Sequence, residues 1–290
     1  MNVAVITVTY NPCLIKLEEQ IISITHMKEL IIVDNGSSNI EKIKILQRKF
    51  NFKLLALGGN YGIAKAQNIG LSHAISLGAE HALLLDQDSV LEKDFLINIY
   101  NVYKDFDCDI LGPVFFDSLS KVEYKGSKYI GPFIKREPVG KLEDVTFIIA
   151  SGSFFSLDVF SLVGGMEESL FIDYVDVDWS LRAKAKGYKV QMTNRAKMSH
   201  DIGDSRTKLF GRAISIHSPI RRYYLIRNSF FMIRKSYVPL GYKIREVIFN
   251  VLRFFVSLIL SQNKKSVLKY SFRGIKDGLS GKFGPYSNEK

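Results

Sequence analysis

The sequence has 290 residues, of which 47% are hydrophobic and 24% charged, with two cysteines and a formal net charge of +11. This composition excludes a disordered chain and a disulfide-rich secreted scaffold, and the length is typical of one large domain or one domain with an appendage. The apolar residues at the N-terminus follow no basic stretch, so we expect no signal peptide there.

The positive charge is concentrated near the C-terminus. Residues 201–290 contain 18 Lys and Arg against 5 Asp and Glu, whereas residues 1–200 contain 22 against 24. A nearly neutral body with a basic tail predicts a polyanionic partner for the tail, which is either nucleic acid or an anionic membrane surface.

Apolar runs alternate with helical periodicities over the first 85 residues. The strands predicted from the apolar runs cover 3–8, 30–33, 54–57 and 83–85. The helices predicted between them cover 14–24, 40–50 and 63–77, and Ser38 with Glu41 predicts a capping box for the second. This alternation indicates an α/β fold with a doubly wound, mostly parallel sheet flanked by helices.

Polar residues follow three of these strands. They are Thr9-Tyr10-Asn11, Asp34 and Asp86-Gln87-Asp88. Because the carboxyl ends of parallel strands meet at one edge of a sheet, we expect these side chains to line one crevice. Asp86 and Asp88 are hard oxygen ligands of the kind that Mg²⁺ or Mn²⁺ prefers, although the same residues also suit a solvated turn that caps the next helix. Glycines 58, 59 and 62 do not form a G-x-G-x-x-G motif, so a dinucleotide site is not supported.

The second half of the chain is less regular. We expect a strand over 147–155, and a helix in which Val177, Leu181 and Ala185 repeat every four residues before Gly187 ends it. Asp176 and Asp178 fall in the first turn of this helix. These two carboxylates can have a functional role or a purely structural one. The structural role would be to stabilise the helix N-terminus and, for Asp178, to pair with Arg182.

Taken together, the motifs resemble those of family 2 glycosyltransferases with the GT-A fold. The matching stretches are 8–11, 33–37, 59–62 with Asn68 and Gly70, 86–88, 151–152, 164–166, 171–179, His200 and 227–228. The Asp-Gln-Asp-Ser and Arg-Asn motifs are similar to those of bacterial rhamnosyltransferases that build O-antigen or similar surface polysaccharide. The resemblance implies a GT-A domain over 1–230, followed by a basic amphipathic helical region over 231–290.

The resemblance also implies the donor, which would be a nucleotide-diphosphate sugar, with dTDP-rhamnose expected. Thr9, Asn11 and Asp34 would hold its nucleoside. Asp86 and Asp88 would hold a divalent metal, Mg²⁺ or Mn²⁺, with His200 as a further metal or diphosphate contact. The remaining donor-binding residues implied are Tyr10, Asn60, Gly62, Lys65 and Gln87.

Asp176 aligns with the usual catalytic base, which would take the proton of the acceptor hydroxyl and produce inversion at the anomeric carbon. Family members often have a glutamate where this chain has Val175. Asp173 and Asp178 lie close by in the sequence, so the motif alone leaves open which of the three carboxylates transfers the proton.

The apolar run 247–260 is too short and too polar to span a bilayer, which needs about 20 apolar residues. It predicts either a helix in the membrane interface or one packed on the catalytic domain. A lipid-linked saccharide acceptor favours the helix in the membrane interface. We therefore expect a peripheral protein at the cytoplasmic face of a bacterial inner membrane, with no nucleic acid as partner. Two other functions compete: a nucleotidyltransferase, which would need a basic, glycine-rich loop at 9–12, and a nucleic-acid-binding protein, which leaves the acidic strand ends unexplained.

Overall fold

The computed structural model describes residues 2–24, 29–118, 120–200, 206–209, 212–215, 218–261 and 263–287. Its main sheet has nine strands in the described part of the chain, ordered β3-β2-β1-β4-β10-β6-β11-β5, with β9 paired to β11. The first four strands in this order are parallel neighbours, and β6 and β11 are also parallel to each other, whereas β10 is antiparallel to both β4 and β6. The predicted mostly parallel α/β sheet is therefore confirmed.

The strands of this sheet are β1 (Val3–Thr9), β2 (Glu29–Asp34), β3 (Lys53–Ala56), β4 (His81–Asp86), β5 (Val90–Leu91), β6 (Ile110–Phe116), β9 (Glu143–Asp144), β10 (Phe154–Ser156) and β11 (Val190–Ser199). Two separate hairpins are formed by β7 (Gly126–Ile130) with β8 (Phe133–Glu137), and by β12 (Arg206–Leu209) with β13 (Arg212–Ser215).

The helices are α1 (Leu14–Ile24), α2 (Ile40–Phe50), α3 (Ile63–Ser76), α4 (Phe95–Asp105), α5 (Leu157–Val163), α6 (Val175–Ala185), α7 (Pro219–Arg234), α8 (Leu240–Leu260) and α9 (Lys264–Ser280), with a 3₁₀ turn, η1, at Glu168–Leu170.

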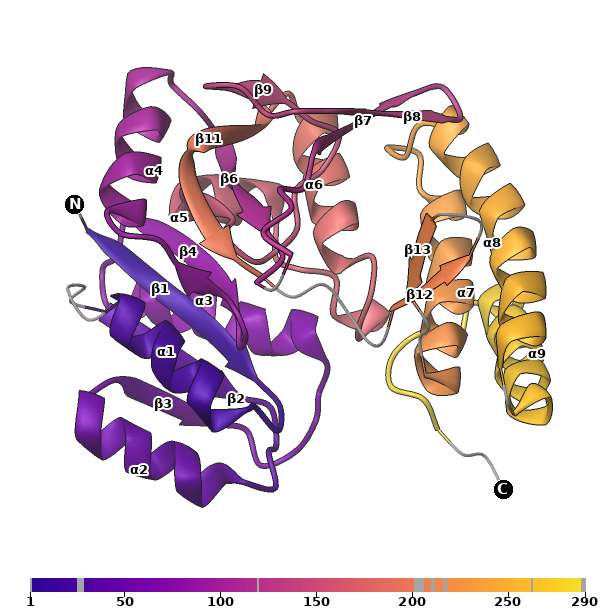
Figure 1. Cartoon of the computed structure of the whole chain (residues 1–290), viewed down its shortest axis with the longest axis horizontal. Coiled ribbons are helices and arrows are strands. Elements are labelled where there is room, and N and C mark those ends of the chain that lie inside the picture. The colour runs from indigo at the N-terminus through magenta and orange to yellow at the C-terminus, as the bar shows by residue number, and fades with distance from the viewer. Residues whose placement is uncertain are drawn as a thin grey trace.

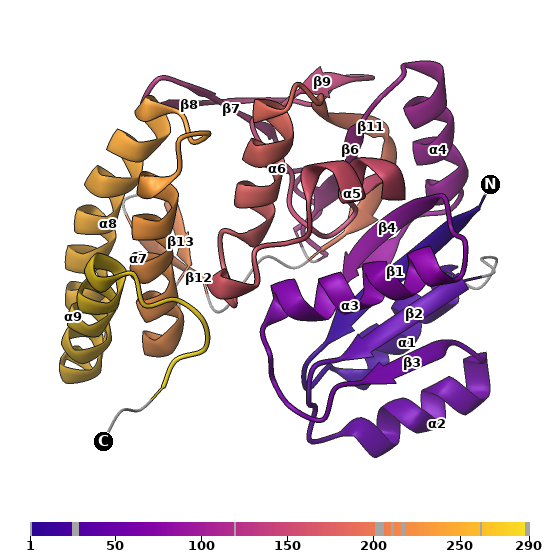
Figure 2. The ribbon, with the colours of Figure 1, turned by 180° about the vertical axis from the view of Figure 1, so that it is seen from behind.

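Helices cover both faces of the sheet, as a doubly wound fold requires. Helices α1 and α2 share one apolar cluster with β2 on the face seen in Figure 1, where Leu17, Ile32 and Ile43 are buried together. Helix α3 lies on the face seen in Figure 2. A Cβ at Gly70 of α3 would come within 2.5 Å of the Ile6 side chain on β1, so glycine there allows the close approach of helix and sheet.

Two local predictions were wrong. The strand expected over 147–155 begins only at Phe154. The chain turns just before it, because Gly152 has a φ of +83° and its N–H donates to Leu84 O of β4. The capping box of α2 does not form: its N-cap is Asn39, and the Ser38 hydroxyl instead donates to Asn11 Oδ1 at 2.8 Å.

The C-terminal helices lie together at the end of the molecule farthest from β3 (Figure 1). The residue 230 boundary proposed from the sequence falls inside α7, which packs against both α8 and α9. In the described part of the chain, no helix is long and apolar enough to cross a membrane. One face of α8 nevertheless exposes a continuous apolar stripe at helical spacing, made of Leu240, Ile244, Val247, Ile248, Val251, Leu252, Phe255 and Ile259.

Candidate active site at the carboxyl edge of the sheet

The sheet register brings the predicted strand ends together. Thr9 is paired with Asp34, and Val8 is paired with Asp86, so these residues lie side by side at the carboxyl edge of β1, β2 and β4. The Thr9 hydroxyl donates to Asp34 Oδ1 at 3.1 Å. Parallel pairing therefore brings together the polar strand ends that the sequence predicts to line one site.

Asp34 is 1% exposed and strongly hydrogen-bonded. In addition to the Thr9 bond, its Oδ2 accepts from the backbone N–H of Gly36 at 3.2 Å and of Ser37 at 2.9 Å. The carboxylate thus shapes the turn after β2. The Ser37 hydroxyl in turn accepts from Asn11 N at 2.8 Å, which ties this turn to the end of β1.

Asn60 connects the β2 turn to the loop before α3. Its Oδ1 accepts from the Asn35 amide at 3.1 Å and from Gly62 N at 3.0 Å. Gly62 has a φ of +88°, and a Cβ there would lie 2.6 Å from Phe171 O, so only glycine fits this contact. Lys65 follows in the first turn of α3 with its Nζ over the exposed Tyr61 ring, 5.3 Å from the centroid.

The Asp86–Ser89 turn is held from below by a buried glutamine. Gln20 of α1 donates to the carbonyl oxygens of Asp86 at 2.6 Å and Ser89 at 2.7 Å, while its own Oε1 accepts from Thr7. Gln20 was not among the residues predicted from the sequence, although its position on the inward face of α1, between Leu17 and Ile21, is unusual for a polar side chain. Gln87 Oε1 accepts from Tyr10 N at 2.8 Å and so joins the ends of β4 and β1.

The three predicted metal ligands do come together. His200 Nδ1 lies 3.3 Å from Asp88 Oδ1 and 2.9 Å from the Ser89 hydroxyl, and His200 Nε2 lies 3.8 Å from Asp86 Oδ2. Ser151 supports this arrangement, because its hydroxyl contacts that of Ser89 at 2.6 Å and accepts from Asp86 N at 3.1 Å. His200 follows β11 and is 111 residues from Ser89 in the sequence, so the fold and not local spacing brings it to the acidic turn.

These residues suit a divalent cation that the substrate helps to hold. Burial raises the pKa of Asp86; His200 opposes this shift and the negative charge of Asp88 adds to it. Within the described residues, no group of three or more His, Cys, Asp and Glu could by itself hold a metal ion. Two half-buried carboxylates and an imidazole nonetheless fit a magnesium or manganese site that keeps waters and takes substrate phosphates as further ligands.

Asp176 lies in the first turn of α6, close enough to the strand ends for its charge to interact with Asp86. Burial raises its pKa to about 6; the Val177 N–H, which donates to Asp176 Oδ1 at 2.9 Å, opposes the shift, and the carboxylates of Asp86 and Asp173 add to it. A carboxyl with this pKa is mostly ionised at neutral pH and still basic enough to accept a proton, as a general base requires.

The two neighbouring carboxylates have other partners. Asp178 is 0% exposed, forms the predicted pair with Arg182 at 2.8 Å, and accepts a hydrogen bond from the Tyr237 hydroxyl. Asp173 pairs with Arg221 of α7 at 3.0 Å. Among the described residues, Asp176 is the one of the three without a cationic or hydroxyl partner.

The loop before α6 is strained and held by α7. Phe171, Asp173 and Tyr174 all have φ values between 63° and 66°, which is uncommon for residues with a Cβ. The Asn228 amide donates to the carbonyls of Leu170, Ile172 and Asp173 at 2.7–3.1 Å. The buried Arg227 donates to Leu170 O at 2.9 Å. The Arg-Asn motif therefore positions the loop that leads into α6 and Asp176.

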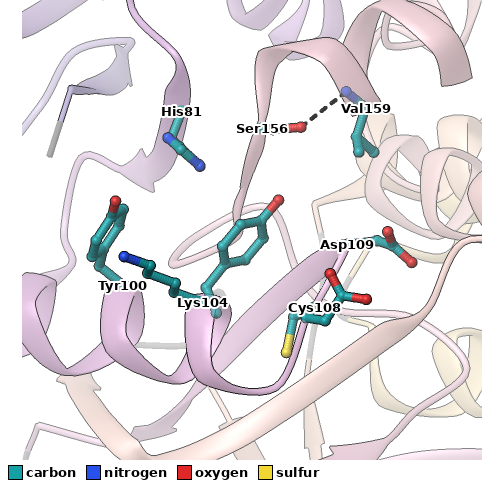
Figure 3. Close-up of a pocket in the computed structure, with 9 residues that line it drawn as sticks. His81, Tyr100, Lys104, Cys108, Asp109, Ser156 and Val159 are labelled. Atoms are coloured by element: carbon teal, nitrogen blue, oxygen red, sulfur yellow. Dashed lines mark hydrogen bonds between the residues drawn. The ribbon is translucent and has the colours of Figure 1, made fainter.

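A second hollow lies at the opposite edge of the sheet. It is lined by His81, Tyr100, Lys104, Cys108 and Asp109 among others, and His81 is the first residue of β4 whereas Asp86 is the last (Figure 3). This hollow is therefore separate from the crevice at the carboxyl edge.

Comparisons with known proteins agree with this architecture. Residues 4–163 match the family described as Glycosyl transferase family 2. The chain is 38% identical over 289 residues to the dTDP-rhamnosyl transferase RfbF of Shigella flexneri, covering 97% of this chain and 96% of that protein.

Two solved structures show the same fold. One is S. aureus TarS 1–349 in complex with UDP-GlcNAc, with a TM-score of 0.59 and 16% identity, covering 97% of this chain and 82% of that one. The other is GalNAc-T7 with UDP, GalNAc and Mn²⁺, with a TM-score of 0.58 and 12% identity; the match covers 97% of this chain but spans only 56% of that one. The expected GT-A fold is thereby confirmed. The family match also argues against the nucleotidyltransferase and nucleic-acid-binding alternatives.

Proposed function

Because this chain belongs to glycosyl transferase family 2 and is a glycosyltransferase, we propose that it transfers L-rhamnose from dTDP-rhamnose to a hydroxyl of a lipid-linked saccharide in cell-surface polysaccharide synthesis. The observation that carries the choice of donor is the 38% identity, over nearly the full length of both chains, to a dTDP-rhamnosyl transferase. The crevice at the carboxyl edge supports a nucleotide-sugar donor, because it combines hydrogen-bonding turns with paired carboxylates.

In this proposal the donor lies along the ends of β1, β2 and β4. The turns built on Asp34 and Asn60, together with Thr9, Tyr10 and Asn11, hold the nucleoside. Lys65 and the backbone at Gly62 contribute from the start of α3. Asp86 and Asp88, held in place through Gln20 and Gln87, would hold the divalent cation together with His200. A cation there would offset the charge that develops on the leaving diphosphate.

The acceptor hydroxyl approaches from the side of α6. Asp176 takes its proton as the oxygen attacks the anomeric carbon, and the bond from that carbon to the diphosphate oxygen breaks on the opposite face. One displacement of this kind inverts the anomeric configuration. The raised pKa of Asp176, about 6, and the absence of a cationic partner among the described residues support its assignment as the base.

The donor can be tested with a panel of sugar nucleotides. We expect dTDP-rhamnose to raise the melting temperature of the full chain in the presence of Mg²⁺ or Mn²⁺, and to be hydrolysed slowly without acceptor. At a ligand concentration of 100 Kd the stabilisation is about 2.7 kcal/mol, which thermal shift resolves. Stabilisation by a uridine or guanosine sugar, and by no thymidine one, would show that the donor is wrong.

We further propose that the enzyme is held peripherally at the cytoplasmic leaflet of the inner membrane by the apolar stripe of α8. That stripe is exposed along the whole helix, and the surrounding C-terminal region is strongly basic. Each Lys or Arg near an anionic leaflet contributes about 1 kcal/mol, and a shallowly inserted apolar face adds to it.

Substituting the stripe tests this attachment. Ile248 of α8 is 50% exposed. Ile248→Glu should lower cosedimentation with anionic liposomes about tenfold or more, because burying such an apolar side chain is worth about 1.5–3 kcal/mol. Ile45→Glu on α2 is the matched control, since that isoleucine is 61% exposed at the other end of the molecule. Equal liposome binding by both variants and the parent would exclude α8 as the attachment surface.

A further inference from the structure

The chain turns sharply where α9 ends. Gly281 has a φ of +70°, and its N–H donates to the carbonyl oxygens of Asp277 and Gly278, so the helix closes there in a left-handed turn. The segment that follows runs along the side of α7 that faces the main sheet, in both views of the molecule (Figures 1 and 2). We call residues 283–286 the return segment.

The return segment packs on buried aromatic residues of α7. The Phe283 ring lies edge-on to Phe231, with the two centroids 5.3 Å apart. The Tyr286 ring meets Tyr223 in the same way, at 4.8 Å. The backbone N–H of Tyr286 also donates to the hydroxyl of Tyr224 at 2.8 Å. These contacts fix the segment on the helix that contains the Arg-Asn motif.

Gly284 joins the return segment to the loop before α6. Its N–H donates to Ser169 O at 2.7 Å, and its carbonyl oxygen accepts from Arg227. The Arg227 guanidinium is buried, lies over the Phe283 ring at 5.7 Å from the centroid, and donates to Leu170 O at 2.9 Å. The return segment therefore holds the loop both directly and through Arg227.

The same loop contacts both sides of the proposed reaction site. Phe171 O accepts from Ile63 N at the start of α3 at 2.8 Å, and the Phe171 ring stacks on Tyr224 with centroids 5.1 Å apart. The loop leads into α6, which has Asp176 in its first turn. Residues in sparsely populated conformations, such as the positive φ values of this loop, persist only where the surrounding structure over-determines them. The contacts that hold the loop therefore decide where Asp176 lies.

We propose that Phe283 and Gly284 are positioning residues of the active site, which hold the loop at 169–174, and through it Asp176, in the geometry needed for attack by the acceptor. The proposal rests on the proposed role of Asp176 as the base and adds to it an element remote in the sequence. A displacement of about 1 Å can cost about 10²-fold in rate. A loosened loop should thus lower turnover, whereas nucleotide binding at the turns after β1 and β2 should remain.

Gly284→Ala tests this role in the full chain. Gly284 has a φ of +103°, and a Cβ there would meet no atom within 4 Å, so alanine strains the backbone without a clash and displaces the segment. Turnover of whichever sugar nucleotide the parent hydrolyses should fall about tenfold to a hundredfold, with unchanged affinity for the corresponding nucleoside diphosphate. Gly78→Ala is the matched control, because Gly78 has a φ of +74° and equally open surroundings beyond the far end of α3. It should keep the turnover of the parent.

Amide hydrogen exchange provides a measurement that needs neither donor nor acceptor. Gly284→Ala should speed exchange in the peptides that cover 169–174 about tenfold or more, and Gly78→Ala should leave them at the parent rate. Phe283→Ala should have the same effect as Gly284→Ala. Phe283→Leu, which keeps an apolar contact with Phe231, should restore part of both the protection and the turnover.

Equal exchange over 169–174 in Gly284→Ala and the parent would overturn the proposal. Faster exchange with parent-like turnover, or a loss of nucleotide affinity in proportion to turnover, would also overturn it, because a merely structural segment gives those results. If the Gly284 and Phe283 variants do not fold, Tyr224→Phe takes their place, since it removes only the hydroxyl that accepts from Tyr286 N. A parent that hydrolyses no sugar nucleotide would contradict the proposed function, while the exchange rates would still decide whether the return segment holds the loop.

Discussion

Replacing Asp176 with asparagine should lower turnover by about 10²–10⁴ while donor binding is retained, because the amide keeps the shape of the side chain but cannot accept the acceptor proton. The activity of the parent should rise as the pH increases through about 6, where Asp176 loses its proton, and this limb of the profile should be missing from any residual activity of the variant. Steady-state kinetics over pH 5–8, with calorimetric titration of the nucleotide, measure both effects.

The stability of the Asp176→Asn variant has a predictable sign. Burial raises the folded-state pKa of Asp176 above its ordinary value of 3.8, so this group favours the folded state below pH 3.8 and that contribution is lost as the pH rises through about 6. At neutral pH the asparagine variant should therefore melt no lower than the parent. A large fall in turnover then reflects chemistry and not unfolding.

The neighbouring carboxylates provide the contrast. Asp178→Asn breaks the ion pair between the fully buried Asp178 and Arg182, whose side chain is 18% exposed, so we expect mainly destabilisation, of up to about 3–5 kcal/mol. Asp173→Asn should loosen the loop before α6 by releasing Arg221. If Asp176→Asn stays active while a folded Asp173→Asn or Asp178→Asn is inactive, the base has been assigned to the wrong residue.

Asp88→Ala should reduce transfer by at least about 10²–10³-fold and leave the fold intact, because it removes a half-buried ligand from a turn whose backbone is held by other residues. The parent should lose activity in excess chelator and regain it with Mg²⁺ or Mn²⁺. Asp86→Ala should also reduce transfer, but by less than Asp88→Ala.

Binding provides a second measurement for the metal site. The affinity of the parent for dTDP should increase when Mg²⁺ or Mn²⁺ is added, and this increase should be absent from Asp88→Ala. Asp105→Ala, at the exposed C-terminal end of α4, removes a carboxylate elsewhere and should retain the increase. Parent-like activity of Asp88→Ala in excess chelator would contradict the assignment.

Local signals in the chain were enough to predict the parallel strands β1 to β4 and the edge of the sheet that carries the candidate site. Buried strands need short apolar runs, and parallel pairing places their carboxyl ends together, so Thr9, Asp34 and Asp86 could be assigned to one crevice before their register was known. Where local and tertiary demands differed, local prediction was wrong. Ser38 resembled a cap but bonds to Asn11, 27 residues away, and the apolar stretch before Phe154 is broken by the turn at Gly152.

The sequence by itself determined the alternation of strands and helices over the first 85 residues, the acidic turn after β4 and the basic charge of the C-terminal region, because these follow from spacing and composition along the chain. Only the tertiary structure distinguished the three carboxylates around α6. Asp173 is paired through Arg221 and Asp178 is bonded by Tyr237, which are 48 and 59 residues away, whereas Asp176 has no such partner among the described residues. Ion pairing of this kind depends on which helices and loops pack together, and spacing along the chain does not reveal that.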